Sequence, residues 1–205
     1  MAIKFDLSES QALVQKNVRD FLEQECPDEL VREAEEADLG YSPELWQKLA
    51  DVGFLSLGIP EQYGGAGSTF FDLGIFFEEA GRVLMPGPHL ATLAIAAPAI
   101  AAYGTEEQKQ QLLSGIAAGK VLFAFALAER DGEISPQSVE MTAERDGDGY
   151  VLSGTKMFTK DTAAATHLLV MARTSSSGHS CSRKSRTFFC TSAWLSLRSN
   201  LIAIV

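Results

Sequence analysis

The chain has 205 residues, of which 46% are hydrophobic and 21% charged, a composition typical of a globular protein that can bury a substantial core. Its net charge of −10 argues against a nucleic-acid partner, because phosphate binding depends on clustered Lys and Arg. The N-terminus lacks a basic stretch followed by an apolar core, and the longest apolar run, Leu90 to Tyr103, is shorter than the roughly 20 residues that cross a bilayer. We therefore expect a cytoplasmic protein without a membrane segment.

The first 120 residues carry a helical pattern and predict an all-α N-terminal domain. Ser8 with Gln11 and Thr105 with Gln108 form capping-box patterns, and Ser42 followed by Pro43 marks another helix start. The helix from about Ser68 to Leu84 is so rich in phenylalanine that we expect it to be central and buried. The predicted helices cover residues 9–26, 28–39, 43–52, 68–84, 90–103 and 106–116.

From Val121 the apolar residues recur with a period of two, which indicates the start of a β-domain over residues 121–173. Phe123, Phe125 and Leu127 fall on one side of the first strand, and alanines fall on the other. A hairpin turning near Asp146 and a further strand from His167 to Ala172 follow. The fold class is therefore α+β, with an all-α helical domain followed by the first strands of an antiparallel β-domain.

Residues 174–205 have a different composition from the rest of the chain. All 27 acidic residues precede position 174, whereas the last 32 residues contain four basic residues and nine serines. One hypothesis is a loss of the coding frame near Ser175 to Gly178, or a foreign tail joined there. The alternative is a natural basic, Ser-rich tail that binds an anionic partner.

The cysteines, Cys26, Cys181 and Cys190, show neither CxxC spacing nor a paired His motif, so the sequence predicts no metal site.

Four motifs follow one another along the chain: Pro60-Glu-Gln-Tyr-Gly-Gly-Ala-Gly67, the run from Tyr103 to Gly119, the strand Phe125-Ala-Leu-Ala-Glu129, and Gly149 to Phe158. In this order they resemble the acyl-CoA dehydrogenase family, over roughly residues 5 to 173. The linker Met85-Pro-Gly-Pro88 resembles the bacterial subgroup that acts on steroid or other bulky acyl-CoAs. The resemblance implies FAD as cofactor, an acyl-CoA substrate, electron-transfer flavoprotein as partner, and a homo- or hetero-oligomer.

The resemblance also implies which residues contact the flavin. The family's strand matching Phe125, Leu127 and Ala128 lies along the flavin ring and normally contributes a Thr hydroxyl, for which this chain has Ala128. Phe158 matches an aromatic beside the flavin, and Thr159 matches a following hydroxyl with a shift of one residue, since Lys160 occupies the strict position. Ser135 is a displaced counterpart of a serine that contacts substrate. In any β-domain, Phe125, Leu127 and Phe158 could equally be packing residues.

The family's catalytic Glu lies in a C-terminal four-helix bundle, which we expect to be absent here, so we assign no catalytic residue. Glu129 matches a motif Glu that is not the proton abstractor. Three functional classes stay open: an FAD-dependent acyl-CoA dehydrogenase present as a truncated chain that is inactive alone, a non-catalytic subunit of a heteromeric dehydrogenase, and a cofactor-free helical interaction module. Ala128 and Lys160 are the residues that suggest the second class.

Overall fold

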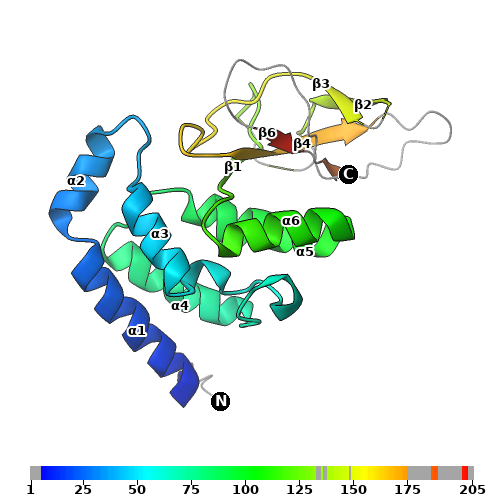
Figure 1. Ribbon diagram of the computed structural model, residues 1–205. Coiled ribbons are helices and arrows are strands. Elements are labelled where there is room, and N and C mark those ends of the chain that lie inside the picture. Colours follow the sequence, from blue (N-terminus) through cyan, green and yellow to red (C-terminus); the bar gives the residue numbers. More distant parts are fainter. Residues whose placement is uncertain are drawn as a thin grey trace, which may run out of the picture.

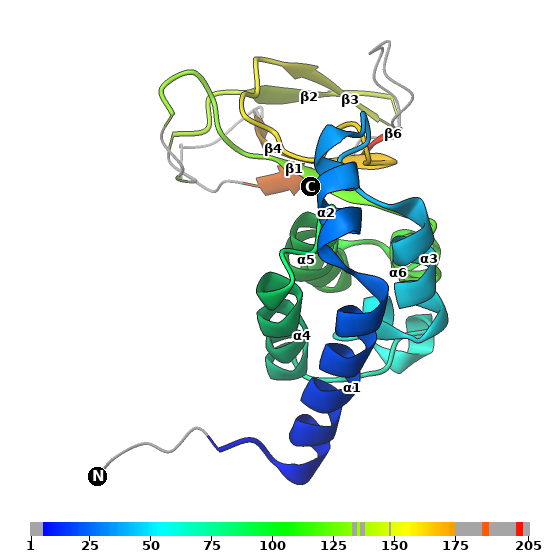
Figure 2. The same cartoon turned by 90° about the vertical axis from the view of Figure 1, so that its left-hand side faces the viewer.

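The computed structural model of the protein describes residues 6–132, 135, 138–147, 149–174, 186–188 and 200–202. Helices form one body, and a sheet lies at one end of it, above α5 and α6 (Figure 1). A view turned by 90° shows the same separation of the two parts (Figure 2). The predicted helical domain followed by a small sheet is therefore confirmed. No helix in the described ranges is long and apolar enough to span a membrane.

The helical body contains six α-helices and three other helical segments within the described residues. The α-helices are α1 (Glu9–Glu25), α2 (Asp28–Glu36), α3 (Pro43–Asp51), α4 (Phe70–Arg82), α5 (Ala97–Tyr103) and α6 (Glu106–Ala117). The other segments are the 3-10 helices η1 (Phe54–Ser56) and η2 (Glu61–Tyr63) and the π-helix η3 (Leu90–Ala96). Both predicted capping boxes are present, at Ser8 and at Thr105, because each hydroxyl accepts from the backbone amide three residues later. A third box at Thr69 begins α4, one residue beyond the expected Ser68.

Helix α4 is only partly buried, which corrects the expectation that it is enclosed on several faces. Phe76 is fully buried, but Phe70 and Phe71 in the first turn are 65% and 49% exposed. On the buried side, Glu79 receives two hydrogen bonds from Arg19 of α1, at 2.9 and 2.7 Å. These bonds hold the pKa of Glu79 below its ordinary value, although burial opposes them. The α1–α4 contact therefore includes a paired buried charge that hydrophobic periodicity does not reveal.

The apolar run from Leu90 to Tyr103 forms two helical pieces rather than one buried helix. Segment η3 is a π-helix, and α5 continues from it with Pro98 in its first turn, where the missing proline amide breaks the regular hydrogen-bond ladder. Thr92 of η3 is fully buried, and its hydroxyl accepts a 2.9 Å hydrogen bond from the amide of Phe123. This contact ties the helical body directly to the first strand.

The sheet is mixed, which corrects the expectation of purely antiparallel strands. Its strands are β1 (Phe123–Ala126), β2 (Thr142–Asp146), β3 (Gly149–Ser153), β4 (His167–Thr174), β5 (Arg186–Phe188) and β6 (Asn200–Ile202). The β2–β3 hairpin is antiparallel as predicted, but β4 runs parallel to β1 and to β2. The chain leaves β1, completes the hairpin and crosses back before β4, so β1 and β4 point the same way. Most of residues 174–205 lie outside the described residues, and both hypotheses for that tail stay predictions.

The Gly-Gly-Ala-Gly segment is a turn held by backbone hydrogen bonds to residues beside η1 and η2. The amide of Gly65 donates to Pro60 and that of Gly67 to Ile59. A Cβ on Gly65 would lie 1.9 Å from the carbonyl oxygen of Ile59, so only glycine fits there without a backbone shift. The turn therefore accounts for this motif by packing alone.

Two glycine substitutions are expected to change stability in opposite directions. Gly65→Ala should lower the free energy of unfolding by about 1–3 kcal/mol because of the clash with Ile59. Gly74→Ala should raise it by about 0.5–1 kcal/mol, since Gly74 lies inside α4 with nothing within 4 Å of the added Cβ. Urea denaturation of both variants checks this, and a stabilising Gly65→Ala would contradict the turn geometry.

Candidate functional site

The structure brings together two of the segments that the sequence predicts to contact a flavin. The amide of Met157 donates a 2.9 Å hydrogen bond to the carbonyl of Ala128. Ala128 follows β1, and Met157 precedes Phe158, so Leu127 to Glu129 runs beside Lys156 to Phe158. Ala128 and Met157 are 29 residues apart in sequence and adjacent in space.

The predicted flavin-contact residues differ in exposure. Phe125 is half-buried and packs against the hydrophobic core, whereas Leu127, Ala128 and Thr159 are half-buried on segments outside the strands. Phe158 is 81% exposed and has a φ of +55°, in the left-handed region that bulky residues rarely adopt. A large apolar side chain held outward by strained backbone is typical of a surface that a ligand or partner covers. Phe158 thus fits a contact role better than a packing role.

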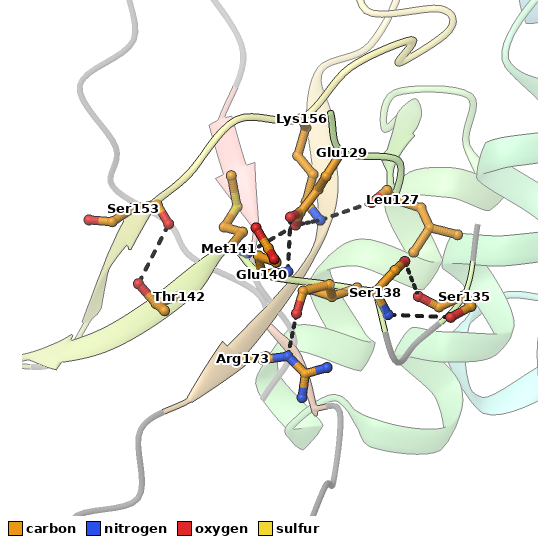
Figure 3. A network of polar contacts seen from close by, with 11 residues as sticks. Leu127, Glu129, Ser135, Ser138, Glu140, Met141, Thr142, Ser153, Lys156 and Arg173 are labelled. Carbon is orange, nitrogen blue, oxygen red and sulfur yellow. Dashed lines mark hydrogen bonds and ion pairs between the residues drawn. The ribbon is translucent and has the colours of Figure 1, made fainter. Parts of the chain in front are cut away.

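A buried ion pair that sequence reasoning did not predict joins these two segments. Lys156 Nζ lies 2.7 Å from Glu129 Oε1, and the two side chains are only 7% and 10% exposed. Lys156 Nζ also donates to the carbonyl oxygen of Leu127 at 2.9 Å. Figure 3 shows the Lys156 and Glu129 side chains pointing toward one another. Both residues lie within recognised motifs, but their pairing could not be read from either motif alone.

The carboxylate of Glu129 has further partners in the segment before β2. It accepts hydrogen bonds from the amides of Glu140 and Met141, at 2.9 and 3.0 Å (Figure 3). Burial alone would raise the pKa of Glu129, but the bonds from Lys156 and from the two amides outweigh it and hold the pKa below its ordinary value. Glu129 is therefore a charged carboxylate at neutral pH.

Arg173 holds the same segment from its other side. Its guanidinium donates to the carbonyl of Val139, and its backbone amide donates to the carbonyl of Met141 at 2.7 Å. Residues 139–141 are consequently fixed between Glu129 and the end of β4. Next to them is a recess of about 400 Å³, whose lining residues are Glu129, Arg130, Asp131, Glu140, Met141, Gly154 and Thr155.

Ser135, the predicted substrate contact, takes part in a local turn. Its hydroxyl accepts from the amide of Ser138 at 3.3 Å, and the Ser138 hydroxyl donates to the Ser135 carbonyl at 2.9 Å (Figure 3). These bonds give Ser135 a structural partner and leave its proposed substrate contact a prediction. Within the described ranges, no group of three or more His, Cys, Asp or Glu side chains could hold a metal ion.

Comparison with known proteins gives matches in both halves of the chain. Residues 8–120 match the family model "Acyl-CoA dehydrogenase, N-terminal domain", and residues 124–192 match "Acyl-CoA dehydrogenase, middle domain". Among curated proteins, acyl-CoA dehydrogenase FadE26 of Mycobacterium tuberculosis is 41% identical over 60% of this chain and 30% of its own length. Acryloyl-CoA reductase (NADH) of Anaerotignum propionicum is 34% identical over 83% of this chain and 43% of its own length.

Solved structures give the same picture. A variant of the Tcur3481-Tcur3483 steroid ACAD is 36% identical with a TM-score of 0.75, covering 82% of this chain and 45% of that one. The ChsE4-ChsE5 complex from Mycobacterium tuberculosis is 33% identical with a TM-score of 0.73, covering 84% and 44%. The chain thus spans less than half the length of these relatives.

Proposed function

Because this chain belongs to the acyl-CoA dehydrogenase family, we propose that it forms one wall of an FAD and acyl-CoA site for the α,β-desaturation of an acyl-CoA thioester. The observation that carries the proposal is the hydrogen bond from Met157 to Ala128, which joins the two segments assigned to the flavin beside the exposed Phe158. The family is one of oxidoreductases whose members generally bind FAD. The residues present fit a flat ring, since Ala128 is small and Phe158 is outward-facing.

When bound, FAD supplies the acceptor for the hydride that leaves the β-carbon of the thioester. The residues of this chain would position the flavin and shield it from water. Leu127 and Ala128 would form a low wall against which a flat group can lie, Thr159 would offer a hydroxyl, and the exposed Phe158 would shield the group from water. Holding reactants in one orientation is the main contribution of such a wall to the rate.

We further propose that the 205-residue chain oxidises no acyl-CoA by itself. Glu129 is the carboxylate within the proposed flavin segments, but its oxygens accept from Lys156 and from two backbone amides. A carboxylate held charged by three donors is a poor proton abstractor. Oxidation of an acyl-CoA by the purified chain with an artificial electron acceptor would contradict this proposal.

The first test measures FAD binding to the 205-residue chain through the quenching of flavin fluorescence. Phe158→Ala should weaken binding by about tenfold, because an aromatic contact is removed. Phe70→Ala removes another exposed phenylalanine, 65% exposed on α4, and should leave binding unchanged. A wild-type chain that binds no FAD would overturn the flavin site and favour the cofactor-free interaction module.

A second function is favoured by one feature of the site. Ala128 replaces the family's Thr, and the Tcur3481-Tcur3483 and ChsE4-ChsE5 relatives are named as pairs of unlike chains. The chain would then be a non-catalytic subunit of a heteromeric dehydrogenase acting on steroid or other bulky acyl-CoAs. Co-purification with a longer relative that carries the Thr and the catalytic base would support this role. Electron-transfer flavoprotein as electron acceptor and a cytoplasmic location are further parts of the proposed dehydrogenase function.

A further inference from the structure

We infer that the Glu129–Lys156 pair is a positioning device that fixes the spacing of the two flavin-contacting segments. This inference rests on the proposed function, because it assigns a role to residues next in sequence to those of the proposed flavin wall. Lys156 immediately precedes Met157 and Phe158, and Glu129 immediately follows Ala128. The pair therefore joins the two segments at the positions next to the residues that face the cofactor.

The geometry gives each charge more than one bond, so that neither side chain can move alone. Lys156 Nζ bridges Glu129 at 2.7 Å and the Leu127 carbonyl at 2.9 Å. Glu129 in turn holds the amides of Glu140 and Met141. The Met157–Ala128 hydrogen bond is therefore flanked by charge-assisted bonds, which are stronger and more directional than neutral ones.

Burial explains why this pair can determine position rather than act as a mobile surface contact. At 7% and 10% exposure both charges are removed from water, so each must keep its partner. Loss of either one leaves a buried charge whose relief requires the two segments to separate. The expected consequence is a displaced Phe158 and a looser cofactor wall, with the helical body unchanged.

The experiment uses the full 205-residue chain and the variants Glu129→Gln, Lys156→Met and the double variant that carries both changes. We expect FAD affinity to fall by at least about tenfold in each single variant. Amide hydrogen exchange at Met157, Glu140 and Met141 should accelerate by at least about tenfold, while amides of α6 keep their wild-type rates. Lys156→Arg keeps a cation and should restore part of both losses.

The control is a second ion pair, Arg19 with Glu79 in the helical body, where the Glu79 side chain is 1% exposed and that of Arg19 is 38% exposed. Arg19→Met should lower the melting temperature and leave FAD affinity and Met157 exchange unchanged. If Glu129→Gln or Lys156→Met fails to fold by circular dichroism, Glu129→Asp takes its place, because the shorter side chain cannot keep its 2.7 Å contact with Lys156 without a shift and should give smaller losses of the same sign.

The outcomes separate this inference from the proposed function. A wild-type chain without FAD binding overturns the proposed function, and Met157 exchange in the variants still decides the positioning role. A wild-type chain that binds FAD, with variants of equal affinity and unchanged Met157 exchange, overturns the inference alone. Equal loss of FAD affinity in Arg19→Met would also overturn it, because the effect would then be general destabilisation.

Discussion

Replacing Phe123 with alanine is expected to lower the free energy of unfolding by about 3–5 kcal/mol, the cost of emptying a fully buried aromatic site. Phe123 begins β1 at the junction of helices and sheet. Its ring lies 5.4 Å from that of His167 on β4, and its amide donates to Thr92 of η3. A cavity here would touch η3, β1 and β4 together, so collapse around it is restricted.

Guanidinium denaturation followed by helical circular dichroism measures the effect of Phe123→Ala. Phe70→Ala is the control, because it deletes the same atoms from an exposed site on α4 and should change stability by less than about 0.5 kcal/mol. A loss below about 1.5 kcal/mol in Phe123→Ala would show that the junction repacks. It would also mean that the sheet is not anchored to the helices through this residue.

The features of the fold that local chemistry determines were predictable from sequence. Capping boxes at Ser8 and Thr105 fixed two helix starts, because the cap and its partner lie three residues apart. The hairpin after Met141 followed from alternation and a Gly-containing turn. Phe70 shows the limit of the method, since composition cannot tell which turn of an apolar helix extends beyond its neighbours.

The features that depend on long-range pairing were not predictable from sequence. The parallel register of Phe123 with His167 joins residues separated by an entire hairpin, and no local signal encodes it. The Glu129–Lys156 pair spans 27 residues in the same way. The resemblance marked both residues as parts of motifs, but only the folded chain brings their charges together. In contrast, Ala128 and Phe158 could be proposed as contact residues from sequence, because each lies inside one motif.

The stability of the chain is expected to fall as the pH drops from 7 to 5, with His89 as a main cause. Burial lowers the pKa of His89 to about 4, more than the nearby backbone of Gly87 raises it. The unfolded chain therefore takes up a proton near pH 6.5, whereas the folded chain takes it up only near pH 4. Because the pKa is lower in the folded state, His89 stabilises the fold fully above pH 6.5, and this stability is lost as the pH falls from 6.5 to about 4. The expected loss is about 2 kcal/mol between pH 7 and pH 5, and about 3 kcal/mol once pH 4 is reached.

The variant His89→Phe removes this titrating group while keeping a ring against Phe77, whose centroid lies 5.9 Å from that of His89. Unfolding free energies of wild type and variant are measured in urea at pH 7, 6 and 5, and between pH 7 and pH 5 wild type should lose about 2 kcal/mol more than the variant. His167 has the same sign, because burial also lowers its pKa, so His167→Phe should flatten the remaining slope. Parallel pH profiles for wild type and His89→Phe would mean that His89 is solvated in the folded chain. Limiting the comparison to pH 5 and above keeps the histidines apart from Glu79 and Glu129, whose lowered pKa values place their titration below that range.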